Sequence, residues 1–391
     1  MCRVLTLCEY GSLNGGERSF LAAAERLVGD GFEFLVAAPD AGPLRIALQH
    51  AGLDHVPFAC HDGSGARRPH SALRAELHRL ISRTRPGLIH ANSLSMSRLA
   101  GPVTRQSHRP AIGHLRDIIR VSRAAIGDLN SHTRLLAVSE ATRTWYVSEG
   151  LDRHKTFVAH NGVDLHQFRP RAPSGYLHAE LGIPVSAILI GSIGQIGPRK
   201  GTDLFVEAAK TVACQACADA HKEAEGVHFL VVGKRYSEKA ESREFEARAR
   251  CEASRPPLRG RLHFLGVRPD VAPLLNELTL LVHAARQEPL GRVLLESAAA
   301  GVAIVATDVG GTREIFPEDR QAAVLVAPDS PGDLAAAMLH LLAAPARRRE
   351  LAQAARQRAQ AAFDAEIAAR RLAAHYRDVV ANHHAGPHAQ M

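Results

Sequence analysis

Apolar runs and amphipathic stretches alternate along the first half of the chain. The apolar runs read as strands: RVLTLCEY, FEFLVAAP, HVPFAC, GLIHAN, AIGHLR and RLLAVS. The stretches between them, such as GERSFLAAAERLVGDG and SALRAELHRLISRTRP, carry apolar residues at helical spacing. Apolar strands that alternate with helices are typical of a parallel sheet covered by helices on both faces.

The same pattern restarts after a proline-rich stretch, FRPRAPSGYLHAELGIP. We therefore expect an α/β fold in which two tandem Rossmann-like, doubly wound domains face each other across a cleft. The predicted boundaries are 1–170 for the N-terminal domain, 171–184 for a linker, 185–365 for the C-terminal domain, and 366–391 for a C-terminal helix with a frayed tail.

Composition narrows the classes of function. The chain has 391 residues, 46% hydrophobic and 23% charged, with a formal net charge of +8. That charge favours an anionic partner: nucleic acid, a phospholipid surface or a phosphorylated substrate. Aromatic residues make up only 5% and no nucleic-acid-binding module is recognisable, so we expect no nucleic acid partner. No apolar stretch approaches the roughly 20 residues that cross a bilayer, and the start lacks a signal peptide's apolar core, so we expect a cytoplasmic protein.

The segment EPLGRVLLE contains two glutamates, Glu288 and Glu296, separated by Pro289 and Gly291. Because proline and glycine interrupt a helix, Glu288 is expected in a loop and a helix is expected to begin near Gly291. The first turn of a helix has unpaired N–H groups and a positive dipole, which suit a phosphate. The glutamates would then flank an anion site. The alternative interpretation is that Glu288 is a solvated loop residue and Glu296 an ordinary charged residue of a helix.

Two further glycine loops follow predicted strands. In GSIGQIGPRKG, the cations of Arg199 and Lys200 could face a diphosphate, although the order of residues is not that of a Walker A motif. In GSLNGGERSF, Gly15 and Gly16 open a helix and allow a ligand to approach the backbone. The alternative for the first loop is a solvated basic turn, and the alternative for the second is an ordinary tight turn.

Taken together, these segments resemble the family 4 glycosyltransferases over nearly the whole chain. The resemblance is carried by NGGERSFLAAAERLVGDGFEFLVAAP, by LAVSEATRTWYVSEGLDRHKTFVAHNGVDLHQFRP, and by the stretch that contains the E-x7-E pair. It implies the GT-B fold, retaining transfer of a hexosyl group from a nucleoside-diphosphate sugar, an N-terminal acceptor domain and a C-terminal donor domain. It also implies that the last helix crosses back onto the N-terminal domain.

The resemblance assigns roles to individual residues. In the C-terminal domain, Glu288 would hold sugar hydroxyls, Glu296 the ribose, and Lys200 the leaving diphosphate, with Arg199 as a second candidate cation beside it. The diphosphate and ribose would also meet the backbone of Gly291, Arg292, Val293 and Leu294, and the base would lie near Gly233, Gly266 and Val267. In the N-terminal domain, His114 would contact the sugar near the reacting carbon, and Gly15 and Gly16 would approach the phosphate.

Three positions depart from the family pattern. Gln195 occupies the position of a usual arginine, His283-Ala284 replace a usual Pro-Ser, and Lys234 replaces a usual acidic residue. These departures bear on the identity of the base and sugar.

The sequence contains no Asp-x-Asp, so we expect neither a metal ion nor another cofactor. A double displacement needs a carboxylate nucleophile, and no convincing candidate lies near His114 in the sequence. We therefore expect front-face retention, in which the acceptor hydroxyl attacks on the side from which the diphosphate leaves. A sugar-nucleotide epimerase of the same fold and a non-catalytic sugar-nucleotide-binding protein remain alternatives.

The helix predicted for SALRAELHRLISRTRP has an apolar face and a basic side. The simpler interpretation is a core-facing helix with solvated arginines. The alternative is peripheral docking on an anionic membrane, at the inner face of the plasma membrane, where a lipid-linked or other glycan acceptor would be presented.

Overall fold

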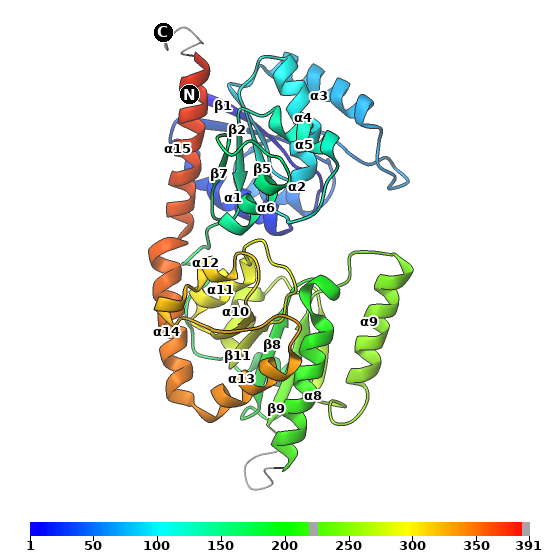
Figure 1. The fold of residues 1–391 in the computed structure, drawn as a ribbon, viewed down its shortest axis with the longest axis vertical. Helices are drawn as coiled ribbons and strands as arrows, with labels where there is room; N and C mark the ends of the chain where they lie inside the picture. Colours follow the sequence, from blue (N-terminus) through cyan, green and yellow to red (C-terminus); the bar gives the residue numbers. More distant parts are fainter. Residues whose placement is uncertain (219–225, 385–391) are drawn as a thin grey trace. The chain divides into compact units, whose positions relative to one another are not determined.

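The computed structural model describes residues 1–218 and 226–384, and the chain divides into two compact units. Unit 1 comprises Met1–Gly162 and the C-terminal segment that begins at Ala365. Unit 2 comprises Val163–Asp364. Figure 1 shows both units and labels many of their helices and strands. The end of the predicted tail, from residue 385, lies outside the described residues.

Unit 1 is built on a parallel sheet with the strand order β3-β2-β1-β4-β5-β6-β7. The strands are β1 (Cys2–Leu7), β2 (Phe32–Ala38), β3 (Asp54–Pro57), β4 (Leu88–Ala91), β5 (Ala111–Leu115), β6 (Arg134–Ala137) and β7 (Thr156–Val158). The order reverses between β1 and β4, which makes the loops at their carboxyl ends the expected place for a ligand.

Helices cover both faces of this sheet. On one face lie α1 (Gly15–Leu27), α2 (Pro43–His50) and α15 (Ala365–His384), and on the other α3 (His70–Thr84), α4 (Leu94–Gln106) and α5 (Arg123–Asn130). The helix α6 (Glu140–Ser148) follows β6. Neighbouring residues of β1 show why the strands are apolar throughout, since Val4 packs on the first face and Leu5 on the second.

The predicted amphipathic helix is α3. Its apolar residues Leu73, Leu77, Leu80 and Ile81 are all buried in the core of unit 1, packed with α4 and the sheet. On its basic side, Arg74 pairs with Asp128 of α5 at 2.8 Å. The apolar face of α3 therefore faces the core, as the simpler interpretation predicts, and is not available to a membrane.

The last helix, α15, belongs to unit 1 although some 200 residues of unit 2 precede it in the chain. It packs along α1. Two ion pairs join its first turn and its second half to the unit, Glu366 with Arg26 and Arg377 with Asp30, both at 2.7 Å. The α1–α15 side of the sheet is thus completed by the C-terminal part of the chain.

Unit 2 is built on a second parallel sheet with the order β10-β9-β8-β11-β12-β13. Its strands are β8 (Ile188–Ile193), β9 (Val227–Val232), β10 (Leu262–Gly266), β11 (Leu280–His283), β12 (Ala303–Thr307) and β13 (Val324–Val326). The order reverses between β8 and β11. Together the two sheets confirm the predicted α/β class with two doubly wound domains.

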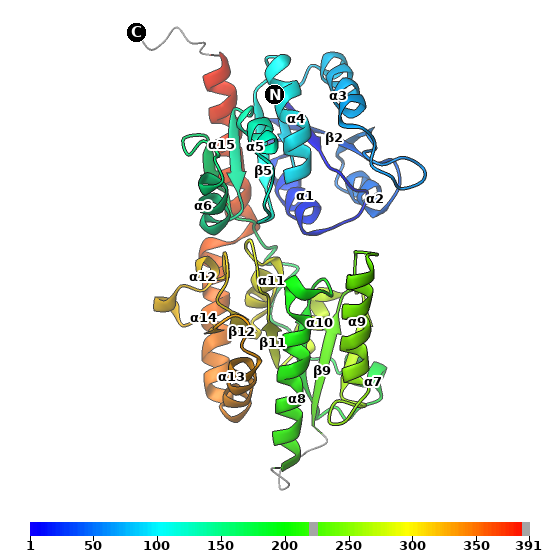
Figure 2. The ribbon, with the colours of Figure 1, turned by 45° about the vertical axis from the view of Figure 1, so that its right-hand side comes forward.

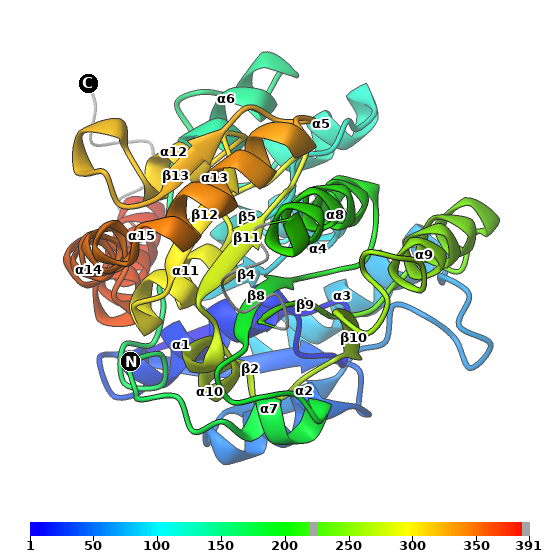
Figure 3. The ribbon, with the colours of Figure 1, turned by 90° about the horizontal axis from the view of Figure 1, so that it is seen from below.

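Helices also cover both faces of the unit 2 sheet, as Figure 3 shows. On one face lie α8 (Thr202–Ala218), α9 (Ala240–Ala253) and α13 (Pro331–Ala343), with α8 and α9 side by side in Figure 2. On the other lie α10 (Val271–Glu277) and α11 (Arg292–Ala300), with α14 (Pro345–Ala362) against α11. Short elements complete the unit: α7 (Tyr176–Leu181), α12 (Thr312–Ile315) and the 3₁₀ turns Pro198–Lys200 and Glu318–Arg320.

The stretch predicted as a linker, 171–184, is part of unit 2 and contains α7. The buried carboxylate of Glu277 holds it in place. This carboxylate accepts hydrogen bonds from the Ser174 amide (2.6 Å), the Ser174 hydroxyl (2.8 Å) and the Gly175 amide (3.0 Å). A carboxylate buried in α10 needs such donors, and the segment supplies them.

Within 1–218 and 226–384, no helix combines the length and the apolar character needed to span a bilayer.

We predict that Glu277→Ala destabilises unit 2, because the Ser174 amide, the Ser174 hydroxyl and the Gly175 amide lose the buried carboxylate that accepts from them. The expected loss is about 3 kcal/mol in the free energy of unfolding, measured by urea denaturation. The control is Glu207→Ala, which removes a carboxylate that is more than half exposed, from the exposed pair with Lys210. Equal effects of the two substitutions would contradict the role given to Glu277.

Candidate functional site

The loops that follow β8 and β11 meet at the point where the strand order of unit 2 reverses. Gly201, at the end of the β8 loop, has φ +63°. A Cβ atom at this position would lie 1.8 Å from the carbonyl oxygen of Ala284, in the β11 loop. Only glycine allows this approach, so the two loops are in direct backbone contact.

Arg286 ties the same two loops together. Its amide donates to the Arg199 carbonyl at 2.9 Å, and its guanidinium donates to the Pro198 carbonyl and to both carboxylate oxygens of Asp203, each at 2.8 Å. Arg286 was not predicted from the sequence, since no local motif marks it. Its contacts fix the loop that carries Lys200 relative to the loop that carries Glu288.

Lys200, Glu288 and His283 form one cluster, in which Glu288 and His283 are buried and Lys200 is partly buried. Glu288 is only 5% exposed, and its Oε2 atom accepts hydrogen bonds from Lys200 Nζ and from His283 Nε2, the latter at 2.8 Å. Burial alone would raise the pKa of Glu288, but the Lys200 charge and the His283 hydrogen bond outweigh it and hold that pKa well below its ordinary value. Oε1 accepts no hydrogen bond from the described residues. Glu288 is thus an ionised carboxylate with one oxygen available to a ligand.

His283 is the last residue of β11 and was noted in the sequence only as a departure from the family pattern. Burial lowers its pKa, more than the neighbouring Glu288 carboxylate raises it. The ring is therefore neutral, with its proton on Nε2, where it donates to Glu288. His283 orients the carboxylate without adding charge to the site.

Arg199 lies beside this cluster, in the turn that carries Lys200. Its positive charge reaches His283 and contributes to lowering the pKa of that ring, after burial. Among the residues that the structure describes, no carboxylate or hydrogen-bond acceptor pairs with the Arg199 guanidinium. The loop after β8 therefore presents one cation that is already paired, Lys200, and one that is not.

The helix α11 begins beside Glu288. Gly291 precedes it with φ +102°, and a Cβ atom there would lie 2.6 Å from Leu294 Cδ1, which explains the glycine. The Leu294 amide donates back to the Gly291 carbonyl at 3.1 Å and so is used within the turn. Glu296 is 8% exposed and accepts from Arg292 Nε at 2.7 Å, a side-chain pairing that was not predicted from the sequence. Val293 lies in the first turn of α11, directly after Arg292.

The ends of β8, β9 and β10 converge on a neighbouring part of the same edge. The Gly233 amide donates to the Gly266 carbonyl at 2.7 Å, and a Cβ atom on Gly233 would lie 1.8 Å from the Gly194 carbonyl oxygen. Val267 follows with an exposed side chain. Lys234 lies over the ring of Tyr236, 5.2 Å from its centroid. These residues form an open glycine-lined edge next to the cluster around Glu288.

The remaining predicted residues lie in unit 1, at the carboxyl edge of its own sheet. His114, at the end of β5, is 4% exposed, and its Nδ1 atom lies 3.2 Å from Arg116 Nη2. Arg116 also donates to the carbonyl and side chain of Asn92, whose amide donates to the Gly16 carbonyl at 3.2 Å. Gly15 and Gly16 open α1. Burial, and then the charge of Arg116, hold the pKa of His114 well below its ordinary value.

Arg116 is a second residue of the candidate site that was not predicted from the sequence, although it stands two positions after His114. A Cβ atom on Gly16 would lie 3.0 Å from its Cδ atom, so this glycine gives the arginine room. Arg116 also donates to Asn161 at 2.7 Å. One side chain thus links the ends of three segments of unit 1.

The chemistry available in unit 2 follows from these charges. An ionised carboxylate with an open oxygen accepts hydrogen bonds from hydroxyl groups. Two cations next to the start of a helix bind phosphate. Within the described residues, no group of three or more His, Cys, Asp or Glu side chains is placed to hold a metal ion.

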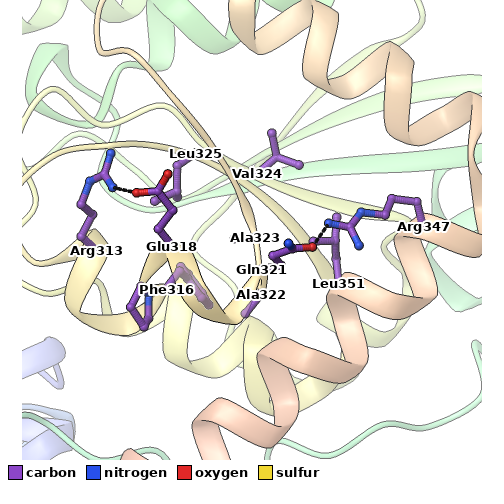
Figure 4. Close-up of a pocket in the computed structure, with 11 residues that line it drawn as sticks. Arg313, Phe316, Glu318, Gln321, Ala322, Ala323, Val324, Leu325, Arg347 and Leu351 are labelled. Atoms are coloured by element: carbon purple, nitrogen blue, oxygen red, sulfur yellow. Dashed lines mark hydrogen bonds and ion pairs between the residues drawn. The ribbon is translucent and has the colours of Figure 1, made fainter.

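A surface hollow of about 240 Å³ lies elsewhere on unit 2, between the segment around α12 and the helix α14 (Figure 4). None of the candidate residues lines it. Two arginines at its rim already have partners, Arg313 with Glu318 at 3.5 Å and Arg347 with Gln321 at 3.0 Å. The hollow is therefore separate from the cluster around Glu288.

Two family profiles match the chain and together span most of it. The profile "Glycosyltransferase Family 4" matches residues 13–167, and "Glycosyl transferases group 1" matches residues 187–344. The first falls in unit 1 apart from its last residues, and the second falls in unit 2.

Among curated proteins, the lipopolysaccharide core biosynthesis mannosyltransferase LpcC of Rhizobium leguminosarum bv. viciae is 33% identical over 172 residues, 44% of this chain and 46% of that protein. This chain covers less than half the length of LpcC, and likewise less than half the length of LpsB of Rhizobium meliloti. The GDP-mannose-dependent alpha-mannosyltransferase of Mycobacterium tuberculosis is 25% identical over 350 residues, 84% of this chain and 85% of that protein.

Solved structures share the fold. Anabaena Alr3699/HepE in complex with UDP-glucose superposes with a TM-score of 0.82 at 22% identity, covering 97% of this chain and 100% of that one. WaaG, a glycosyltransferase involved in lipopolysaccharide biosynthesis, superposes with a TM-score of 0.70 at 18% identity, covering 95% and 98%. With the two parallel sheets and both family profiles, these likenesses show that the chain belongs to the family 4 glycosyltransferases and has the GT-B fold.

Proposed function

We propose that this protein is a retaining glycosyltransferase that moves a hexosyl group from a nucleoside-diphosphate sugar to a hydroxyl group of a glycan or lipid-linked acceptor, without a metal ion. One observation carries the proposal: the buried carboxylate of Glu288, paired with Lys200 and with Arg199 beside it, lies at the strand reversal of unit 2. Ligands of such sheets bind at this place.

The two cations are proposed to bind the diphosphate of the donor. When the sugar departs, negative charge develops on the β-phosphate, and fixed positive charges nearby lower the energy of that state. Lys200 is held in place by Glu288, so it needs no rearrangement to act. Arg199, which has no acidic partner in the described structure, is free to pair with a phosphate oxygen and would supply the arginine that Gln195 replaces.

Glu288 is proposed to hold the sugar. Its Oε2 atom is occupied by Lys200 and His283, which leaves Oε1 to accept hydrogen bonds from sugar hydroxyls. Because the carboxylate stays ionised, it accepts and does not donate. Glu296, one turn into α11, would hold the ribose, with the backbone of Gly291 to Val293 near the diphosphate.

Retention is proposed to proceed by front-face attack. A covalent intermediate would require a carboxylate on the opposite side of the sugar, near His114. The side chains hydrogen-bonded to His114 are His90 and Arg116, and neither is a carboxylate. The acceptor hydroxyl would attack on the face that the diphosphate leaves, and a diphosphate oxygen would take its proton.

The relatives support a hexose donor and a saccharide acceptor. LpcC is named a lipopolysaccharide core mannosyltransferase, and HepE is solved with UDP-glucose. We therefore propose a GDP- or UDP-hexose as donor and a growing polysaccharide or lipopolysaccharide core as acceptor. A lipid-linked acceptor would bring the protein to the cytoplasmic face of a membrane.

The proposal is tested by screening UDP-, GDP- and dTDP-sugars for thermal stabilisation, because a bound donor stabilises the folded chain by mass action. The stabilising donor, labelled in the sugar, is then incubated with core saccharides, and the anomeric configuration of the product is read by NMR. Conversion of the donor without an acceptor would favour an epimerase. Binding without turnover would favour a non-catalytic binding protein, and an inverted anomer would exclude retention.

We predict that Lys200→Ala lowers kcat by about 100- to 1000-fold, because the departing diphosphate loses a preorganised charge. Initial rates with the stabilising donor measure the effect. Lys210→Ala is the matched control, since Lys210 lies in α8 of the same unit and pairs with Glu207 and Glu252. Near-normal turnover of Lys200→Ala would exclude the role proposed for this residue.

We predict that Arg199→Ala weakens donor binding roughly 10- to 100-fold, which corresponds to one lost hydrogen bond between charged groups. Calorimetric titration with the intact nucleotide sugar and with the free nucleoside measures it. The free nucleoside, which carries no phosphate, should bind both proteins equally. A parallel loss for the nucleoside would mean that Arg199 does not act through the diphosphate.

We predict that excess EDTA leaves the initial rate unchanged, because Lys200, Arg199 and the start of α11 supply the positive charge that a metal ion would otherwise provide. The measurement is the transfer rate before and after dialysis against chelator. Loss of activity that returns with Mg²⁺ or Mn²⁺ would overturn the metal-independent mechanism.

A further inference from the structure

Unit 1 contains a buried pair of histidines that the proposed chemistry uses only in part. His90 lies in β4 and His114 in the neighbouring strand β5. Their rings stack with centroids 5.5 Å apart, and His90 Nε2 lies 3.2 Å from His114 Nδ1. Both side chains are buried, so their hydrogen bonds must be made within the protein or to a ligand.

The pair is extended by a tyrosine from the far end of the sequence. The hydroxyl of Tyr376, in α15, lies 2.7 Å from His90 Nδ1. Tyr376 is fully buried, with its ring against Phe32 and Phe34 of β2. A chain of hydrogen bonds therefore runs from the C-terminal helix through β4 to the end of β5.

The positions of the protons in this chain follow from Arg116. A guanidinium only donates, so His114 Nδ1, at 3.2 Å from Arg116 Nη2, is an acceptor and the His114 proton is on Nε2. His90 Nε2 must then donate to His114 Nδ1, which leaves His90 Nδ1 to accept from the Tyr376 hydroxyl. The reverse order would place a proton on His114 Nδ1, facing the arginine. Burial, and then Arg116, keep both rings neutral, lowering the pKa of His90 to about 3.

The chain ends in a donor without an acceptor. His114 Nε2 is buried and has no hydrogen-bond partner within the described residues. Leaving a buried N–H unpaired costs free energy, and three side chains act together to keep the proton there. This arrangement is expected where the acceptor is an oxygen of a bound ligand.

We infer that Tyr376 is a positioning residue, which acts through His90 to hold His114 as a neutral imidazole that donates from Nε2 to an oxygen of the transferred sugar. The inference rests on the proposed function, in which His114 contacts that sugar. It gives α15 a part in the site in addition to its packing on α1.

The physical role of the hydroxyl is to bias one tautomer of His90. With a donor at Nδ1, the proton of His90 stays on Nε2, directed at His114. Without it, the Nδ1–H form of His90 becomes accessible. In that form, lone pairs of His90 Nε2 and His114 Nδ1 face each other, and His114 is held by Arg116 alone.

The test is Tyr376→Phe in the full chain, with two readouts. With ¹⁵N-labelled histidine, NMR nitrogen shifts should show only the Nε2–H form of His90 and His114 in the native protein, and an Nδ1–H population of His90 in the variant. The kcat should fall about three- to tenfold, as expected for one hydrogen bond, with the donor KM nearly unchanged.

The matched control is Tyr146→Phe. Tyr146 is equally buried in unit 1, and its hydroxyl takes no part in the histidine chain. The control should leave kcat and the His90 shifts as they are, and circular dichroism checks that both variants fold. An Nδ1–H form of His114 in the native protein, or unchanged kcat and His90 shifts in Tyr376→Phe, would overturn the inference.

The NMR readout separates this inference from the proposed function. If Lys200→Ala retained full transfer activity, the proposed donor chemistry would fail. The nitrogen shifts of His90 and His114 would still report whether Tyr376 sets the tautomer.

Discussion

The buried charge of Glu288 is the constraint on which the architecture of unit 2 depends. A carboxylate removed from water is costly unless charged and hydrogen-bonding groups compensate it, and Lys200 and His283 provide both. Those partners come from separate strands, so the ends of β8 and β11 must adjoin. Gly201 allows the backbones to touch, and Arg286 clamps the two loops. The ionised state of Glu288 thus depends on the parallel pairing of β8 with β11, on Gly201 and on Arg286.

Much of the fold could be predicted because its signals are local. Strands buried on both faces must be apolar throughout, and helices between them must be amphipathic, so the pattern of two parallel sheets is visible in the sequence. The family profiles and the GT-B likeness confirm that prediction. The stretch 171–184 was harder, because its prolines suggest a linker, whereas its attachment depends on Glu277, about 100 residues further on.

The site was predictable only where a residue carries a motif. Glu288, Lys200 and Arg199 stand in recognisable loops and Glu296 follows in α11, and the structure finds both glutamates buried. His283 and Arg286 act through partners brought close only by folding, and Arg286 meets Asp203 from 83 positions away. In unit 1 the sequence marks His114, yet its tautomer depends on Arg116 and on Tyr376, which is 286 positions from His90. No local spacing encodes such contacts.

The membership of α15 in unit 1 has a consequence for biosynthesis. The ribosome delivers the strands of unit 1 first, but the apolar side that α15 covers stays bare until all of unit 2 has been made. Unit 2 is one continuous segment, so it can fold while unit 1 still lacks α15. Exposed apolar surface on nascent chains favours aggregation, so the strands of unit 1 have reason to depend on chaperones until α15 has been made. The helix α15, which is made after unit 2, therefore completes the packing of unit 1.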